Sequence, residues 1–330
     1  MKITVPDYYL KFKCIADKCT DSCCIGWEID IDDRTMAKYA ALGGDFGEKI
    51  REITQHGVFP LGENGRCAFL DDNGLCRIIS AVGEGYLCDI CREHPRYYGI
   101  GADGLDGGLG LACPEAARII LGQVGLPDFV TVEGSPSYTA TDPYAAKAHE
   151  LRDFLYSIIY YSDDALSMRS KFSAFAAFAD DVAFSTVSGI AITAKPDTDL
   201  CDESIPDGYV SELVSVFCEC EALNEEWEKR LGEARLVNEG ELENGILKNG
   251  DEYRALLFYF THRYLRECIE DMSAAGRIML ARCSADLIFL IACTYGERDA
   301  LERAAVLFSK NVEYSTDNVD LLIDLLASNI

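Results

Sequence analysis

The chain has 330 residues, of which 49% are hydrophobic, and a formal net charge of −26. This composition excludes a disordered chain, and because no basic tract interrupts the negative charge, it also excludes nucleic acid as an expected partner. The longest uninterrupted apolar stretch, residues 287–293, is far shorter than the roughly 20 residues that cross a bilayer, and the first residues lack the apolar core of a secretory signal. We therefore expect a cytoplasmic protein with no membrane span.

Residues 1–124 are predicted to form a cysteine-rich metal-binding domain with little regular structure. Residues 27–32 alternate apolar and acidic side chains, which is typical of a short strand. The acidic pair that follows Ile31 is predicted to open a helix running to Tyr39 or Leu42.

Two further signals lie in the same segment. The turn sequence Asp-Asp-Asn-Gly at 71–74 separates two short apolar pieces and predicts a small β-hairpin. Pro114 suits the first position of a helix, so the thiol of Cys113 is expected at a helix N-terminus, where a thiolate is stabilised.

A linker is expected over 125–141, and residues 142–330 are predicted to form an α-helical domain. Asp142-Pro143 has the form of a helix N-cap followed by proline, and apolar residues then recur with helical spacing up to Ile159. Further apolar stripes indicate helices at 172–182, 213–231, 253–264 and 322–326. Polar stretches between them indicate loops at 191–208 and 240–251. The predicted fold is mainly α, with the cysteine-rich domain packed on the helical domain.

Cysteine is the most informative residue type, because nine of the 15 cysteines lie before residue 114. In the cytosol disulfides are kept reduced, so a dense group of thiols is expected to bind a metal or to be redox-active. Cysteines in the helical part are interpreted as small core residues, as at Cys268. The candidate metal ligands are Cys14, Cys19, Cys23, Cys24, Cys67, Cys76, Cys88, Cys91 and Cys113.

The spacing of these cysteines suits a thiolate-bound metal. Four of them fall within 14–24, and Cys88-x2-Cys91 lets two thiolates reach one ion. The nine exceed what one tetrahedral zinc or one [4Fe–4S] cluster needs, and spacing alone does not name the metal. Adjacent residues usually point apart, so Cys23 and Cys24 are expected to serve one centre only in a strained loop. A zinc site that merely holds the small domain together is the alternative to a functional centre.

Polar residues near the thiols are candidates for additional ligands or cofactor contacts. Asp21, Asp89 and His94 are more often turn or supporting residues than ligands, and we leave them out of the ligand set. Arg92 and Arg96 can place guanidinium groups over a sulfur cluster or a ligand carboxylate, and they are the predicted cofactor-binding residues. The alternative for both arginines is ion pairing with the abundant surface acids.

The order of these motifs resembles the FliB-type flagellin lysine N-methylases and, more distantly, cysteine-rich proteins described as zinc- or iron-chelating. The resemblance spans about 115 residues, in which six linked motifs give the match its specificity. They are Val5-Pro6-Asp7-Tyr8 with Phe12-Lys13-Cys14, Cys19-x3-Cys23-Cys24-x2-Trp27-x-Ile29-x-Ile31-Asp32, Cys67-Ala68-Phe69-Leu70, Gly74-Leu75-Cys76-Arg77-Ile78, Leu87-Cys88-x2-Cys91-Arg92-x2-Pro95-Arg96 and Ala112-Cys113-Pro114-Glu115-Ala116-Ala117-Arg118.

The resemblance implies a protein lysine N-methyltransferase. In such an enzyme S-adenosylmethionine donates the methyl group, the substrate is flagellin or a similar lysine-bearing protein, and the cysteines bind a metal centre, a [4Fe–4S] cluster or alternatively zinc. Looser matches at 256–264 and 308–315 extend the resemblance to the helical part.

Departures from the family pattern leave the methyl-donor site and the catalytic residue unassigned. His94 stands where the family more often has tyrosine. The glycine-rich stretch 106–110 does not have the residue pattern of a dinucleotide-binding fingerprint. Glu115 and Tyr97 are the nearest guesses for a base. A non-catalytic metal-binding interaction module and an iron–sulfur redox protein are the alternative functions.

Overall fold

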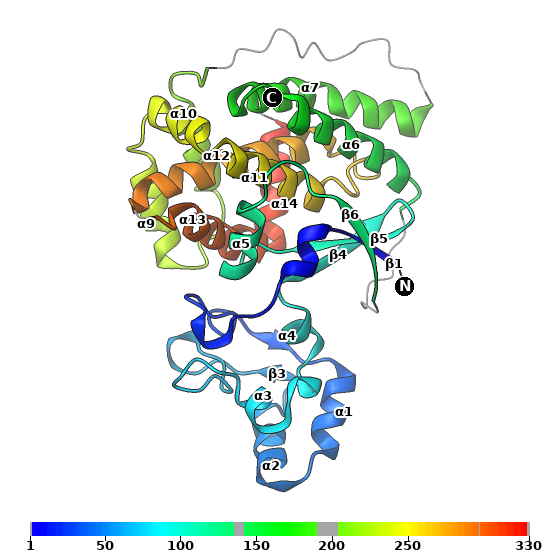
Figure 1. The fold of residues 1–330 in the computed structure, drawn as a ribbon, viewed down its shortest axis with the longest axis vertical. Helices are drawn as coiled ribbons and strands as arrows, with labels where there is room; N and C mark the ends of the chain where they lie inside the picture. The colour runs from blue at the N-terminus through cyan, green and yellow to red at the C-terminus, as the bar shows by residue number, and fades with distance from the viewer. Residues whose placement is uncertain (1, 135–141, 190–203, 297, 329–330) are drawn as a thin grey trace. The chain divides into compact units, whose positions relative to one another are not determined.

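The structure is a computed structural model that describes residues 2–134, 142–189, 204–296 and 298–328 (Figure 1). The chain folds into two compact units, each described here by itself. The cysteine-rich unit comprises Lys13–Tyr97 and Cys113–Glu115, and the helical unit comprises Met1–Phe12, Tyr98–Ala112 and Ala116–Ile330. The division therefore differs from the two consecutive ranges expected from sequence, because the strands that flank the cysteine-rich unit belong to a sheet of the helical unit.

The sheet of the helical unit has four strands in the order β4-β5-β1-β6. Strand β1 (Lys2–Pro6) runs parallel to β5 (Gly104–Leu109) and antiparallel to β6 (Phe129–Glu133), and β4 (Arg96–Gly101) lies beyond β5. Strand β6 lies inside the range 125–141 that was expected to be a linker, so that expectation is wrong for residues 129–133, while 135–141 lie outside the described residues.

Two buried polar contacts join this sheet to the helices. Arg152 forms an ion pair with Asp106 of β5 at 2.7 Å between Nη1 and Oδ2, with both side chains at most 4% exposed. His262 donates from Nε2 to the carbonyl of Gly107 at 3.0 Å and accepts at Nδ1 from the hydroxyl of Tyr156 at 2.9 Å. Burial, reinforced by the charge of Arg152, holds the pKa of His262 well below its ordinary value, so the ring is neutral.

Besides the sheet and a 3-10 turn at Asp7–Lys11, the described helical unit consists mainly of helices. Helix α12 packs against α7, α11, α13 and α14, and its residues 278–291 are all buried (Figure 1). The elements are α5 (Pro114–Leu121), α6 (Ala145–Tyr161), α7 (Ala165–Ser188), α8 (Tyr209–Phe217), α9 (Glu225–Ala234), α10 (Glu239–Lys248), α11 (Gly250–Tyr264), α12 (Ala274–Tyr295), α13 (Ala300–Phe308), a π-helical turn (Ser309–Glu313) and α14 (Thr316–Ala327).

Helix α12 is long and apolar enough to pass a length-and-hydropathy test for a membrane-spanning helix. However, 78% of its most apolar window is buried inside the helical unit. A helix that is apolar on all sides is what the core of a large helical assembly requires.

A carboxylate on α12 ties four helices of this core together. Asp286, with a fully buried side chain, accepts hydrogen bonds from Tyr209 Oη of α8 at 2.6 Å and Tyr253 Oη of α11 at 2.7 Å. Arg169 of α7 pairs with it at 2.9 Å, and Arg282, one turn earlier on α12, lies 3.3 Å away. The centre therefore holds two buried guanidinium groups around one carboxylate.

Several predicted boundaries in the helical unit are wrong. Helix α6 begins at Ala145 because the carboxylate of Asp142 accepts from the amide of Tyr144 in a local turn and does not cap the helix. The loop expected over 240–251 is mostly α10, which a capping box between Asn238 and Glu241 initiates. Most of the loop expected over 191–208 falls on residues 191–203, which lie outside the described residues.

The apolar stripe predicted over 213–231 is divided into α8 and α9 by a short break, and Asn224 caps the start of α9. The core interpretation holds for Cys220, Cys268 and Cys283, which are buried, and is wrong for Cys218 and Cys293, whose positions are exposed.

The cysteine-rich unit has a small apolar core and short elements. Strand β2 (Ile29–Asp30) pairs antiparallel with β3 (Val58–Phe59), and its buried residues share a core with Tyr39, Ile50 and Phe69. Its helices are α1 (Asp33–Ala41), α2 (Gly44–Ile53), α3 (Arg77–Val82) and α4 (Asp89–Glu93).

Helix α1 confirms the prediction of a helix after Ile31. The β-hairpin predicted around 71–74 is reduced to one bridge between Leu70 and Cys76, because α3 begins at Arg77. The turn itself is present, since the carboxylate of Asp71 accepts from the amides of Asn73 and Leu75.

Candidate metal centre

All nine candidate cysteines lie in the cysteine-rich unit, and all are free thiols in the structure. Five of them gather around one part of its core. The amide of Cys67 donates to the carbonyl of Cys24 at 2.8 Å, which brings two distant segments side by side. The other members pack against the same apolar core as Cys67. We call this set the inner thiol group: Cys24, Cys67, Cys76, Cys88 and Cys91.

Backbone amides point at the sulfurs of the inner thiol group. The amide of Phe69 donates to Sγ of Cys67 at 3.5 Å, and the sulfurs of Cys76 and Cys88 also accept from backbone N–H groups that follow them in the chain. Burial raises the pKa of Cys67 to about 11, although these amides oppose the shift. N–H donors aimed at sulfur stabilise a thiolate, the form in which cysteine binds metal.

Two pairs of thiols are close enough to share a proton. Cys88 precedes α4 and Cys91 lies one turn later, and a hydrogen bond from Cys91 lowers the pKa of Cys88 while raising its own. In the same way a hydrogen bond from Cys23 lowers the pKa of Cys24 to about 7, although burial opposes the shift. In each pair the hydrogen bond between the two thiols favours the thiolate form of one partner.

The remaining four thiols form a looser outer set. A hydrogen bond to Cys24 and burial raise the pKa of Cys23, and the charges of Cys14 and Cys113 raise it further. Cys14 and Cys113 therefore lie near Cys23. Cys19 donates its thiol proton to the carbonyl of Asp21 at 3.1 Å. Apart from each other, the adjacent residues Cys23 and Cys24 therefore have different thiol neighbours: Cys23 lies near the outer set and Cys24 near the inner thiol group.

The donor chemistry fits a soft metal, because thiolates supported by amide donors are the ligands of zinc and of iron–sulfur clusters. Within the described residues, no group of three or more His, Cys, Asp or Glu side chains is spaced to hold an ion directly. Metal binding would remove protons from the thiols and draw them together, as it does in small metal-dependent domains.

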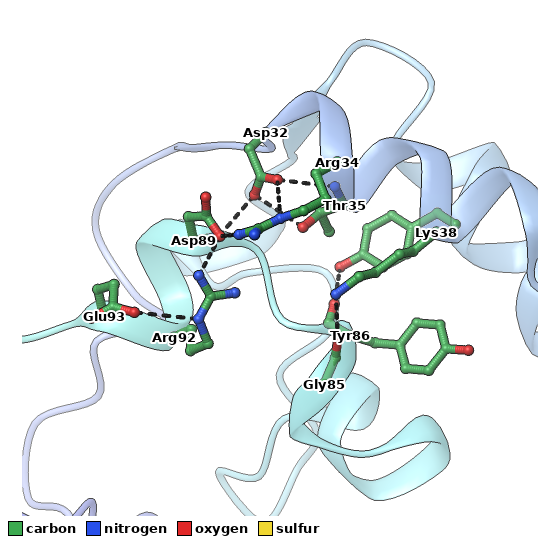
Figure 2. A network of polar contacts seen from close by, with 10 residues as sticks. Asp32, Arg34, Thr35, Lys38, Gly85, Tyr86, Asp89, Arg92 and Glu93 are labelled. Carbon is green, nitrogen blue, oxygen red and sulfur yellow. Dashed lines mark hydrogen bonds and ion pairs between the residues drawn. The ribbon is translucent and has the colours of Figure 1, made fainter. Parts of the chain in front are cut away.

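The polar residues predicted near the thiols have separate contacts. Arg92 of α4 pairs with Asp89 and, at 3.3 Å, with Glu93, which is the surface ion pairing considered as its alternative role (Figure 2). Arg96 is half-buried at the start of β4. The ring of His94 lies 6.4 Å from that of Trp27.

Glu115 and Tyr97 both lie within the cysteine-rich unit and are half-buried. A cofactor-binding role for the two arginines and a catalytic role for Glu115 or Tyr97 stay predictions.

Sequence reasoning missed a buried carboxylate in the helical unit. The side chain of Glu313 is 1% exposed and accepts from the hydroxyls of Tyr259 at 2.9 Å and Tyr264 at 2.8 Å, while Nε of Arg263 lies 3.3 Å away. It ends the π-helical turn, a feature that is frequent at functional sites. Its only sequence signal was its place within 308–315, one of the loosely matching segments.

Three curated proteins are similar to the chain. The flagellar biosynthetic protein FliU of Salmonella muenchen is 30% identical over 150 residues, which are 42% of this chain and 85% of FliU. Lysine-N-methylases of Salmonella typhimurium and Salmonella choleraesuis are each 32% identical over 132 residues, 36% of this chain. The match spans only about a third of those two relatives, 32% of their length. No protein-family model and no solved structure matches the chain.

Proposed function

We propose, on the premise that this chain belongs to the family of the flagellar biosynthetic protein FliU, that it is a protein lysine N-methyltransferase with a cysteine-ligated metal centre. Two relatives that are named lysine-N-methylase support the reaction. The single structural observation that carries the metal centre is the packing of four thiols against one small core, with Cys24 joined to one of them, Cys67, by a backbone hydrogen bond.

The inner thiol group is the proposed ligand set. Four of its five members satisfy a tetrahedral zinc ion or a [4Fe–4S] cluster, and the fifth is left for a supporting role. A bound metal would supply cross-links that a core of this size lacks. The iron–sulfur cluster is our first choice of metal centre and zinc is the alternative.

The proposed methyl donor is S-adenosylmethionine, and the proposed substrate is a flagellin-like protein. Transfer forms a bond from the methyl carbon to a lysine nitrogen as the bond to sulfur breaks, and it releases S-adenosylhomocysteine and one proton. The amine must first be neutral, although the ordinary pKa of lysine is about 10.4. The net charge of −26 favours the approach of a basic substrate segment at low ionic strength.

The test begins with protein purified without oxygen. Iron, acid-labile sulfide and zinc are measured together with the visible spectrum, and about four irons and four sulfides per chain with broad absorption near 400 nm are expected for a cubane. Labelled S-adenosylmethionine is then supplied with flagellin, and methyl-lysine is identified by mass spectrometry.

Each outcome has a defined meaning. Methyl-lysine formed by the loaded protein supports the proposal. Full metal loading without binding of S-adenosylmethionine would favour a non-catalytic interaction module, and a reversible cluster potential without methylated product would favour a redox protein. Zinc without sulfide would replace the cluster by a structural metal.

A further inference from the structure

Helix α1 lies beside Gly85 and Tyr86, which precede Cys88 in the chain (Figure 2). Nζ of Lys38 donates to the carbonyl of Gly85 at 2.7 Å, and the hydroxyl of Tyr39 donates to the carbonyl of Tyr86 at 2.7 Å. Two successive residues of α1 therefore fix two successive carbonyl groups, the second of them two residues before Cys88.

The contact continues at the start of α1, where one carboxylate serves two helices. Oδ1 of Asp32 accepts from the amide of Thr35 at 2.9 Å and caps α1. Oδ2 of Asp32 accepts from the hydroxyl of Thr35 at 2.9 Å and from the amide of Asp89, the first residue of α4, at 2.8 Å. Cys88 occupies the N-cap position of α4, and Asp32 supplies an acceptor for the amide of Asp89, which has no partner within a helix that it begins.

Ion pairs tie the same two helices together. Asp89 pairs with Nη2 of Arg34 from α1 at 2.5 Å and with Arg92 from its own helix. Helix α4 has only five residues and is too short to form on its own, because nucleating a helix costs more than one turn returns. Its geometry, and with it the distance between Cys88 and Cys91, depends on α1.

Tyr39 connects this contact to the core on which the thiols pack. Its side chain is fully buried in the same core as Cys88, and Cys91 packs against that core. Its hydroxyl fixes the carbonyl of Tyr86, two residues before Cys88. The ring is thus held by packing, and the hydroxyl then fixes the backbone that presents the two thiols.

We propose that Asp32 and Tyr39 are positioning residues that hold the Cys88–Cys91 turn ready for metal before the metal binds. The inference rests on the metal centre proposed above. A prearranged pair of thiols loses less conformational freedom on binding, and removal of such outer partners typically lowers metal affinity 10- to 100-fold. The contacts to Asp32 and Tyr39 are therefore expected to act chiefly on metal retention.

The decisive variant is Asp32→Asn. Asparagine is a good N-cap, so it can keep the bond to the amide of Thr35, but its second polar atom is then an NH2 group that cannot accept from the amide of Asp89. Asp164→Asn is the matched control. Asp164 caps α7 by accepting from the amide of Ser167, and this is the one hydrogen bond described for its side chain. Tyr39→Phe removes one hydroxyl and retains the buried ring, and it provides a second variant if the first fails to fold.

The readouts are the rate at which loaded protein releases metal to a chelator and the rate at which metal-free protein reacts with a thiol reagent. Asp32→Asn is expected to release metal 10- to 100-fold faster than the wild type. Tyr39→Phe is expected to shift the rate in the same direction by a smaller factor, and Asp164→Asn to stay within about twofold of wild type. In the metal-free Asp32→Asn protein, the reaction of Cys88 and Cys91 with the reagent is expected to accelerate.

Two results would overturn the inference alone. One is that the wild type binds metal but both Asp32→Asn and Tyr39→Phe release it at the wild-type rate. The other is equally fast release from Asp164→Asn, because that would reflect general destabilisation. A wild-type protein that takes up neither zinc nor iron would overturn the proposed metal centre as well, so the two failures are distinguishable.

Discussion

The charge imbalance around Asp286 gives an ordered prediction about stability. Asp286→Asn removes the carboxylate and leaves the guanidinium groups of Arg169 and Arg282 facing each other in the core. Arg282→Met removes one guanidinium and leaves a pair of one arginine and one carboxylate. Nε of Arg282 has no hydrogen-bond partner within the described structure, so its loss releases an atom that is already unsatisfied.

The magnitudes follow from burial. The side chains of Arg169, Arg282 and Asp286 are 5%, 7% and 0% exposed, so solvent screens the centre weakly. Breaking such a pair from one side costs about 3–5 kcal/mol, which lowers the melting temperature of a domain of this size by about 6–20 °C. Arg282→Met is expected to cost at most about 2 kcal/mol, because the remaining pair stays balanced.

Urea unfolding followed by far-ultraviolet circular dichroism at pH 7 measures both variants. Asp324→Asn, the same substitution at an exposed position of α14, is the control and is expected to stay within about 0.5 kcal/mol of wild type. A loss in Arg282→Met equal to or larger than that in Asp286→Asn would refute the reasoning, since it would mean that the second guanidinium contributes as much as the carboxylate.

Three further predictions concern metal, pH and packing. Cys91→Ala should lose metal and destabilise the cysteine-rich unit, whereas Cys268→Ala should keep its metal; equal loss in metal analysis would contradict the division of the cysteines. Because the pKa of His262 is lowered in the folded state, the unfolded state binds its proton first as the pH falls, so stability should drop by about 1 kcal/mol between pH 7 and pH 5.5, and His262→Gln should flatten that slope in urea titrations. Gly276→Ala should destabilise by about 1–3 kcal/mol because its Cβ would lie 2.3 Å from a carbonyl oxygen of α14, whereas Gly232→Ala on the open face of α9 should be neutral or stabilising by thermal melts.

The helices that were predictable from sequence are those with one apolar face. Helices α6, α7, α11 and α14 each contain a predicted apolar stripe. Helix α12 was not predicted as an element, because a helix buried on all sides has no polar face and so gives no period. Helix α10 was missed because its two glycines, Gly240 and Gly245, obscured the capping box that begins it.

The cysteines could be selected from sequence, but their grouping could not. The two-residue gap between Cys88 and Cys91 is local, and it predicted two thiols that reach one site. The position of Cys24 beside Cys67 depends on a backbone hydrogen bond between segments 43 residues apart, which no local pattern encodes. Asp32 was assigned to a helix start, and its second bond to α4 lies outside any spacing rule.

The cysteine-rich unit is inserted in the chain between strands that pair in the sheet of the helical unit. Strand β1 precedes β5 and β6 in the chain and pairs with both, and about 85 residues of the cysteine-rich unit intervene before β5. While those residues are unfolded, joining β1 to β5 closes a long flexible loop, at an entropic cost that grows with its length to about 4 kcal/mol. Once they are folded, the distance between Phe12 and Tyr98 is fixed and most of that cost disappears. Ordering of the cysteine-rich insert thus promotes closure of the sheet through chain entropy alone.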